Sequence, residues 1–137
     1  MALTHLVDTS VIKRLADASI RSAVEALVAR GELGRPTICD LEVGYSARNE
    51  DEWRRLNQAL EVFVLVETTA DHVRRALQVQ RLLAERSQRG RKISDLLVAA
   101  AAEEQGLTVL HYDADFDIIS KVTRQPVQWV VPAGSVD

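Results

Sequence analysis

The sequence predicts an α/β fold in which helices cover both faces of a mostly parallel β-sheet. Short apolar runs alternate with longer segments of helical periodicity along the whole chain, which is the pattern of successive β–α–β units. Hydrophobic residues make up 47% and charged residues 27% of the 137 residues, a balance that favours a packed core over disorder. Since the chain has no internal repeat, linker or low-complexity segment, we expect a single domain over residues 1–137.

The first half of the chain predicts three strands separated by helices. An apolar run over residues 3–7 predicts the first strand, and Asp8 stands at its carboxyl end. Apolar residues at helical spacing between Ser10 and Arg30 predict two helices, broken near residues 17–19, and the glycines at positions 31 and 34 predict a stop. Shorter patterns then predict a strand over 36–39, helices over 41–48 and 51–60, and a β-branched strand over 62–66.

The second half predicts two long helices and two more strands. Thr68 or Thr69 is a suitable N-cap for a helix over residues 70–88. Residues 93–105 are apolar and rich in alanine, which predicts a buried helix that ends at Gly106. Strands are predicted over residues 108–110 and 127–131, with a polar loop over 111–117 after the first of them.

Net charge does not exclude a nucleic-acid partner, because basic residues are concentrated in one segment. The formal net charge is −3, but residues 74–92 contain seven basic residues and one acid. Aromatic residues, at 4%, are too few to suggest base stacking as the main contact. Cys39 is the single cysteine, so the chain cannot form an internal disulfide. Since the sequence shows neither a signal peptide nor a long apolar run, we expect a cytoplasmic protein that binds no membrane.

Five acidic residues from four separate segments are predicted to meet at one edge of the sheet. Asp8 and the pair Asp113 and Asp115 follow predicted strands, while Glu42 and Asp95 lie in the first turns of predicted helices. Ligands of open α/β sheets bind beyond the carboxyl ends of the strands. Because clustered carboxylates repel one another, a hard cation such as Mg²⁺ or Mn²⁺ would stabilise them, and it would activate a water for attack on a phosphate.

Each of these acids, taken singly, also has a structural explanation. Asp8 could cap the following helix, and Asp95 could stabilise its helix by lying at the positive end of the dipole. Asp113 and Asp115 could form an ordinary turn, and Glu42 could be a solvated helix residue. Their predicted position at a common edge is what favours a functional site.

Four segments of the chain contain these acids or adjoin them: LVDTSVI at residues 6–12, DLEVGYSA at 40–47, ISDLLVAAAA at 93–102 and LHYDADF at 110–116. Together they resemble the PIN-domain ribonucleases, most of all the VapC-type toxins of bacterial toxin–antitoxin pairs. The resemblance covers essentially the whole chain, with the segments in the family's order. It implies a three-layer α/β/α sandwich with about five strands and a metal-dependent endoribonuclease that cleaves tRNA or ribosomal RNA. It further implies a homodimer that is inhibited by a VapB-type antitoxin.

The resemblance also implies roles for individual residues. The catalytic acids would be Asp8, Glu42, Asp95 and Asp113, with Ser10 as a supporting hydroxyl. The ligands of a Mg²⁺ ion, or of Mn²⁺, would be Asp8, Asp95, Asp113 and Asp115. The chain departs from the family at His111, where threonine is common. We expect this histidine to face solvent or pack against a helix, without a catalytic role.

Basic residues near the acids are candidates for contacts with RNA phosphates. These candidates are Arg14, Arg86, Arg89, Arg91 and Lys92, and the alternative for each is a place on a solvated helix face. Trp53 stands in a polar helix, where it either packs in the core, which is the favoured interpretation, or contacts an antitoxin. For the whole chain, the alternative to a ribonuclease is a non-catalytic module of the same fold that binds RNA or protein.

Overall fold

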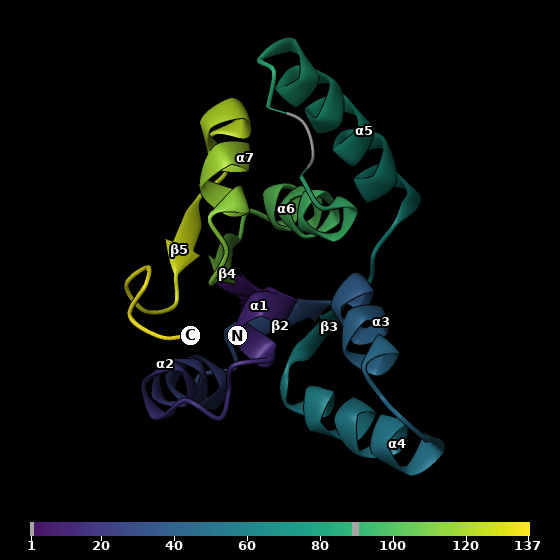
Figure 1. Cartoon of the computed structure of the whole chain (residues 1–137), viewed down its shortest axis with the longest axis vertical. Coiled ribbons are helices and arrows are strands. Elements are labelled where there is room, and N and C mark those ends of the chain that lie inside the picture. The colour runs from purple at the N-terminus through teal and green to yellow at the C-terminus, as the bar shows by residue number, and fades with distance from the viewer. Residues whose placement is uncertain (1, 89–90) are drawn as a thin grey trace.

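The structure confirms the α/β architecture, with the five strands of the described chain in one parallel sheet (Figure 1). It is a computed structural model that describes residues 2–88 and 91–137. The spatial order of the strands is β3-β2-β1-β4-β5, so the first strand of the chain lies at the centre of the sheet. The strands are β1 (His5–Val7), β2 (Leu33–Pro36), β3 (Val64–Val66), β4 (Thr108–His111) and β5 (Val127–Trp129).

Helices cover both faces of this sheet, so the molecule is a three-layer α/β/α sandwich. One face carries α5 (Ala70–Glu85), α6 (Ile93–Gln105) and α7 (Asp115–Thr123), and the other carries α1 (Thr9–Ile12) and α2 (Ala18–Ala29). Between β2 and β3 the chain forms α3 (Thr37–Tyr45), α4 (Glu50–Ala59) and the 3-10 turn η1 (Leu60–Val62). Within the described ranges, none of the helices has the length and apolar character that crossing a bilayer requires.

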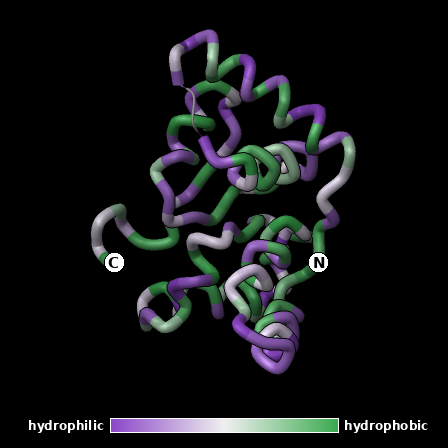
Figure 2. Tube along the Cα trace, turned by 45° about the vertical axis from the view of Figure 1, so that its right-hand side comes forward, coloured by the Kyte–Doolittle hydropathy of each residue, from purple (hydrophilic) through white to green (hydrophobic). Residues whose placement is uncertain are grey.

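The core is built from strand residues that point alternately to the two faces of the sheet. In β1, Leu6 packs with the layer of α5, α6 and α7, whereas the next residue, Val7, packs with α1 and α2. Val109 and Leu110 of β4 divide in the same way. Residues 96–102 of α6 are buried throughout, because this helix lies against both the sheet and α5. The outer helix α5 buries one side only, and in Figure 2 hydrophilic and hydrophobic residues alternate along it.

The second strand begins earlier in the chain than the sequence pattern predicts. β2 covers Leu33–Pro36 instead of residues 36–39, and α3 follows at once. Leu33 is buried in the sheet, whereas Pro36, which has no amide N–H, ends the strand and stands at the N-cap of α3. Gly34 is needed inside the strand, since a Cβ atom there would lie 3.0 Å from Leu3 Cδ1 and 3.1 Å from Val66 Cγ2. The predicted helix stop is confirmed at Gly31, which follows the C-cap of α2 with a φ of 69°, whereas Gly34 belongs to β2 instead of the stop.

A second difference concerns the polar loop predicted over residues 111–117. His111 ends β4 and Asp115 begins α7, a helix that is absent from the sequence-based prediction. Phe116 and Ile119 are fully buried three residues apart, as one face of a helix requires, but the acids interspersed with them obscure this pattern. By contrast, α6 has the predicted bounds, and Gly106 ends it with a φ of 69°.

Candidate active site

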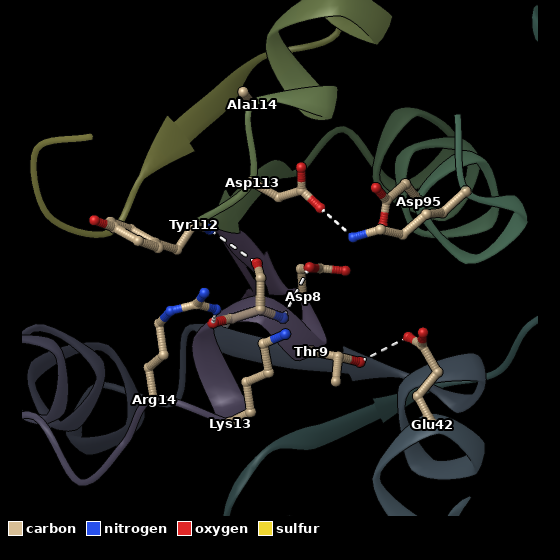
Figure 3. A pocket seen from close by; sticks show the side chains of 11 residues that line it. Asp8, Thr9, Lys13, Arg14, Glu42, Asp95, Tyr112, Asp113 and Ala114 are labelled. Atoms are coloured by element: carbon tan, nitrogen blue, oxygen red, sulfur yellow. Dashed lines mark hydrogen bonds and ion pairs between the residues drawn. The ribbon is translucent and has the colours of Figure 1, made fainter. Parts of the chain in front are cut away.

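A pocket opens at the carboxyl edge of the sheet, beyond the ends of β1 and β4 (Figure 3). Asp8 follows β1, Glu42 belongs to α3, Asp95 belongs to α6, and Asp113 lies between β4 and α7. Although these acids come from four separate segments, all of them line the same pocket. Among the described residues the lining consists of Asp8, Thr9, Ser10, Lys13, Arg14, Glu42, Lys92, Asp95, Tyr112, Asp113 and Ala114.

Asp8 is held at the end of β1 with one carboxylate oxygen bonded and the other unsatisfied. It is the N-cap of α1, where its Oδ2 accepts a hydrogen bond from the Ser10 amide at 2.9 Å. The other oxygen, Oδ1, is buried and has no hydrogen-bond donor among the described residues. Burial raises the pKa of Asp8, although the hydrogen bonds from Ser10 oppose the shift. The capping explanation is therefore correct, but it accounts for Oδ2 alone and gives no reason for the buried Oδ1.

Thr9 and Ser10, which follow Asp8, connect it to the other segments of the site. The Ser10 hydroxyl accepts a hydrogen bond from the Tyr112 amide at 2.9 Å, which joins the start of α1 to the end of β4. The Thr9 hydroxyl donates to Glu42 Oε1 at 2.8 Å and so orients the carboxylate that α3 contributes (Figure 3). Sequence reasoning missed Thr9, and its place between two site residues was the only signal that could have indicated it.

Asp95 is a second buried acid with an unsatisfied oxygen. It lies in the first turn of α6, and its Oδ2 has no hydrogen-bond donor within the described parts of the chain. Burial, followed by the charges of Asp8 and Asp113, raises the pKa of Asp95 to about 8. An ionised carboxylate in such surroundings destabilises the fold unless a cation compensates its charge.

In contrast to Asp8 and Asp95, two acids near them are paired with cations of the chain itself. The Lys92 ammonium lies 2.8 Å from Asp113 Oδ2, and the Arg91 guanidinium lies 2.6 Å from Asp115 Oδ1. Burial acts to raise the pKa of Asp113, but the Lys92 ammonium and the Asp115 amide outweigh it and hold this pKa below its usual range. The site thus contains both compensated and uncompensated carboxylates.

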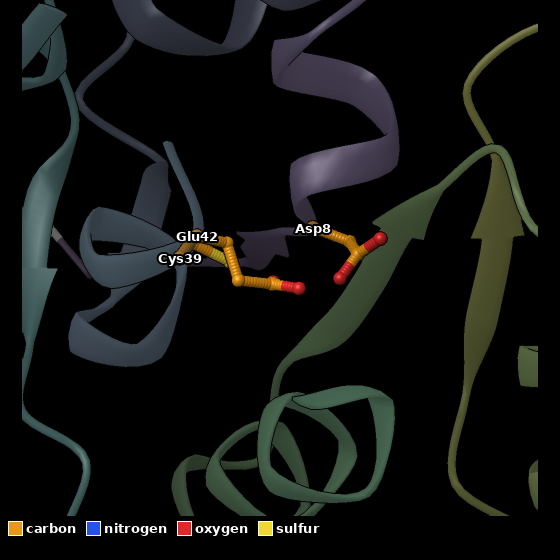
Figure 4. A group of neighbouring side chains, drawn as sticks. All are labelled: Asp8, Cys39 and Glu42. Atoms are coloured by element: carbon orange, nitrogen blue, oxygen red, sulfur yellow. The ribbon is translucent and has the colours of Figure 1, made fainter. Parts of the chain in front are cut away.

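In the part of the chain that the structure describes, side-chain atoms that could hold a metal ion form two groups. Within each group the candidate ligand atoms lie within 4.8 Å of one another; the first contains Asp8, Cys39 and Glu42 (Figure 4), and the second Asp95, Asp113 and Asp115. The Cys39 thiol is a poor ligand, because it is buried, donates to a backbone carbonyl of β1 at 3.7 Å, and has a pKa raised by burial. Carboxylate oxygens are the ligands that Mg²⁺ and Mn²⁺ prefer. The buried, unsatisfied oxygens of Asp8 and Asp95 therefore fit a hard divalent cation.

His111 is a buried packing residue that also contacts the backbone of Asp113. Its ring centre lies 5.0 Å from those of Phe116 and Trp129, so the expectation that it packs against a helix is confirmed. Burial lowers the pKa of His111 to about 4, and the ring is therefore neutral at pH 7. Its Nδ1 accepts a hydrogen bond from the Asp113 amide at 3.1 Å, which orients the start of the segment that carries this acid.

Three basic side chains line the pocket. Arg14 donates to the Ser10 carbonyl at 2.7 Å and stacks on the Tyr112 ring, with 4.8 Å between the guanidinium carbon and the ring centre. Lys92 reaches the acids as described above, and Lys13, which sequence reasoning did not single out, is the third. Phosphate binding by Arg14 and Lys92 stays a prediction.

The other phosphate-binding candidates are Arg86, Arg89 and Arg91, and the two that the structure describes, Arg86 and Arg91, do not line the pocket. Arg91 is engaged with Asp115 beside the pocket. Arg86 follows the end of α5, does not line the pocket, and donates to the Lys121 carbonyl at 3.5 Å. Arg89 lies outside the described residues. A role in RNA binding stays a prediction for each of the three.

Trp53 is not a core residue, so the favoured interpretation of this side chain is wrong. On α4 it is 47% exposed, and it packs against Gly44 of α3, where a Cβ atom would lie only 2.7 Å from the indole Nε1. Tyr45, beside Gly44, is exposed as well. Contact of Trp53 with an antitoxin stays a prediction.

Comparison with known sequences finds one matching family model and relatives that cover almost the whole chain. A family model described as the PIN domain matches residues 5–122. The chain is 66% identical over 137 residues to Ribonuclease VapC51 of Mycobacterium tuberculosis, with 100% of both chains covered. It is 40% identical to Ribonuclease VapC21 of the same species, over 98% of this chain and 99% of that relative.

Comparison with solved structures shows the same fold at low sequence identity. A structure of VapBC2 from Rickettsia felis, bound to a DNA fragment from its promoter, matches with a TM-score of 0.76 and 16% identity, over 94% of this chain and 99% of that one. A toxin–antitoxin complex from Klebsiella pneumoniae matches with a TM-score of 0.73 and 20% identity, over 93% of this chain and 98% of that one. At these identities the likeness establishes the fold alone.

Proposed function

The chain belongs to the PIN-domain family, and from its likeness to the VapC ribonucleases we propose that it is the ribonuclease toxin of a toxin–antitoxin pair. More specifically, we propose a metal-dependent endoribonuclease whose active site is the pocket lined by Asp8, Glu42, Asp95 and Asp113, here called the acid pocket. The observation that carries this proposal is the meeting of acids from four segments, two of which keep a buried oxygen without a donor in the described chain.

The residues of the pocket would hold an ion and a substrate in defined places. Asp8 and Asp95 would each offer an unsatisfied oxygen to Mg²⁺ or Mn²⁺, Asp95 together with Asp113 and Asp115, and Asp8 from the neighbouring group that contains Glu42. Such an ion would supply a nucleophilic water at neutral pH and stabilise charge on the phosphate. Glu42, oriented by its hydrogen bond to a neighbouring hydroxyl, would take up the proton that the attacking water loses.

The basic residues at the pocket favour RNA as the substrate. Lys13, Arg14 and Lys92 line the pocket beside the carboxylates, so a phosphate backbone that approaches the acids meets positive charge as well. By analogy with the family we propose tRNA or ribosomal RNA, cleaved in the cytoplasm, so that translation and growth stop.

We propose two protein partners, a VapB-type antitoxin and a second copy of the chain. The toxin–antitoxin complexes among the similar structures support the first partner. Trp53 and Tyr45 expose apolar surface on α4 and α3 that suits an antitoxin segment. Val73, Leu77 and Ile93 form a separate exposed apolar group on α5 and α6, which suits the contact in a homodimer.

The alternative is a non-catalytic module of the same fold that binds RNA or protein. Against it stands the complete acid set, since Asp8, Glu42, Asp95 and Asp113 all line the pocket. A module that only binds would gain nothing from buried carboxylates that lack partners, because these cost stability.

Induction of the chain in bacteria, followed by sequencing of newly formed RNA ends, tests the proposal. We expect the native chain to stop growth and to create new ends in tRNA or ribosomal RNA, and Asp95→Asn to do neither. Asp17→Asn is the matched control, because it makes the same change at the N-cap of α2, where asparagine caps as well. Growth arrest by Asp95→Asn at equal expression would favour the binding module.

The purified chain allows the metal requirement to be measured directly. In Mg²⁺ or Mn²⁺ we expect Asp95→Asn to cleave RNA about 10³-fold more slowly than the native chain. EDTA should stop the native chain, and an excess of Mg²⁺ should restore it. Cleavage that continues in chelator would show that no divalent ion takes part.

A further inference from the structure

Lys92 places a positive charge among the acids of the pocket. It stands at the N-cap position of α6, and its ammonium lies 2.8 Å from Asp113 Oδ2, the contact drawn as a dashed line at Asp113 in Figure 3. The other oxygen of Asp113 already accepts the Asp115 amide at 2.9 Å. Each oxygen of Asp113 thus has a partner in the chain, and the partner of Oδ2 is the charged one, Lys92.

The acids of the site are compensated unevenly by the chain. Asp113 and Asp115 are paired with Lys92 and Arg91, whereas Asp8 forms no ion pair within residues 2–88 and 91–137. The charge of Lys92 also acts on Asp95. Lys92 is thus a counter-ion to the same carboxylates that would hold a divalent ion.

We propose that Lys92 is an internal counter-ion that competes with the divalent ion for Asp113. This inference rests on the proposed function, because it concerns the same acids. In the metal-free chain the ammonium compensates Asp113. A bound divalent ion supplies that charge itself and repels the ammonium, so the contact between Lys92 and Asp113 is lost when the ion binds.

The exposure of the two cations indicates which of them can move. The Lys92 side chain is 61% exposed, and a flexible four-carbon stem lets it leave the pocket at little cost. The Arg91 side chain is only 21% exposed and is held against Asp115. Exchange with an ion is therefore assigned to Lys92, and Arg91 stays in place.

Calorimetric titration of Mn²⁺ into the metal-free chain provides the first test. If binding has to break the contact with Lys92, then Lys92→Gln should bind Mn²⁺ about tenfold more tightly than the native chain. Lys13→Gln removes an equal charge from the same pocket and should tighten binding only about twofold, through the general field. Equal effects of the two variants, or weaker binding by Lys92→Gln, would overturn the proposal.

A spectroscopic measurement on the native residue provides the second test. The chain has three lysines, Lys13, Lys92 and Lys121, so ¹³C-dimethylation, which keeps their charge, gives three lysine signals beside that of the N-terminal amine, and single substitutions can assign them. Saturation with Mg²⁺ should move the Lys92 signal to the position of an exposed lysine and leave Lys121, on α7, unchanged. A Lys92 signal that keeps its position would contradict exchange.

Neither measurement uses RNA, so the two proposals can fail separately. A chain that shows both expected responses but cleaves no RNA would refute the ribonuclease proposal and leave the competition intact. A chain that cleaves RNA but shows neither response would refute only the competition between Lys92 and the ion.

Discussion

Two groups of largely buried charges in this molecule are built in opposite ways. Arg35 of β2 donates to Asp40 Oδ1 at 2.9 Å and to two backbone carbonyls around η1, so both charges are paired and hydrogen-bonded. In the acid pocket, buried oxygens of Asp8 and Asp95 have no donor in the described chain. The first group therefore stabilises the fold on its own, whereas the second leaves buried carboxylate oxygens whose charge only a proton or a cationic ligand can compensate.

Because of this difference, substitutions in the two groups should change the stability of the fold in opposite directions. Breaking the Arg35 group leaves a buried charge without its partner and lowers stability. Removing a charge from the acid pocket relieves repulsion and desolvation, so it raises the stability of the metal-free chain while it destroys activity. Three measurements sharpen the contrast, beginning with the largest expected change.

The largest change in stability is expected from Arg35→Met. It leaves Asp40 and two carbonyls without their donor and should lower the free energy of unfolding by about 3 kcal/mol, as measured by urea denaturation. Arg54→Met is the matched control, because Arg54 pairs with Glu50 on an exposed face of α4, where the loss should be under about 0.5 kcal/mol. An equal loss of unfolding free energy in the two variants would show that the buried pair stabilises the fold no more than the exposed pair does.

A smaller change, of opposite sign, is expected for Asp95→Asn in the metal-free chain. The pKa of Asp95 is about 8 in the folded chain and near 3.9 when unfolded, so its protonated form stabilises the fold below about pH 4, and this contribution is lost as the pH rises through about 8. The variant does not titrate. Between about pH 5 and pH 9 its free energy of unfolding should therefore exceed that of the native chain by about 1–3 kcal/mol.

Thermal melts over this pH range, without and with saturating Mg²⁺, provide the measurement. The ion should remove the advantage of the variant, because it compensates the ionised Asp95 of the native chain. A constant difference between the two chains at all pH values would mean that Asp95 titrates normally.

The smallest effect is expected at Thr9, whose hydroxyl orients Glu42. Thr9→Val keeps the shape of the side chain but removes one hydrogen bond, worth about 1 kcal/mol, so kcat/KM for RNA cleavage should fall about fivefold. Thr9→Ser keeps the hydroxyl and should retain most of the activity. If both variants cleave RNA as fast as the native chain, the orientation of Glu42 does not limit the reaction.

The parts of the fold that were predictable from the sequence are those that depend on local composition. The alanine-rich run of α6 and its terminal Gly106 gave the correct bounds, because burial and capping were both visible in neighbouring residues. The convergence of the acids was also predictable, since the carboxyl ends of parallel strands meet at one edge.

The parts that escaped prediction depend on contacts between distant segments. The position of β2 follows from the close approach of Gly34 to Val66, thirty-two residues later, and the exposure of Trp53 follows from its packing on Gly44. The ion pair of Lys92 joins the start of α6 to the segment between β4 and α7. A sequence reveals that a carboxylate is present, but only the folded geometry reveals which of its oxygens has a partner.

The central position of β1 also has a consequence for how this chain is made. Among the five strands of the described chain β1 is synthesised first, yet Leu6 pairs with Val109 of β4, so this neighbour in the sheet is synthesised about a hundred residues later. Until that partner has emerged, the nascent polypeptide holds Asp8 without Asp113 and has no assembled centre. The acid pocket therefore exists only once the segment that follows β4 has been synthesised, and every shorter nascent chain lacks it.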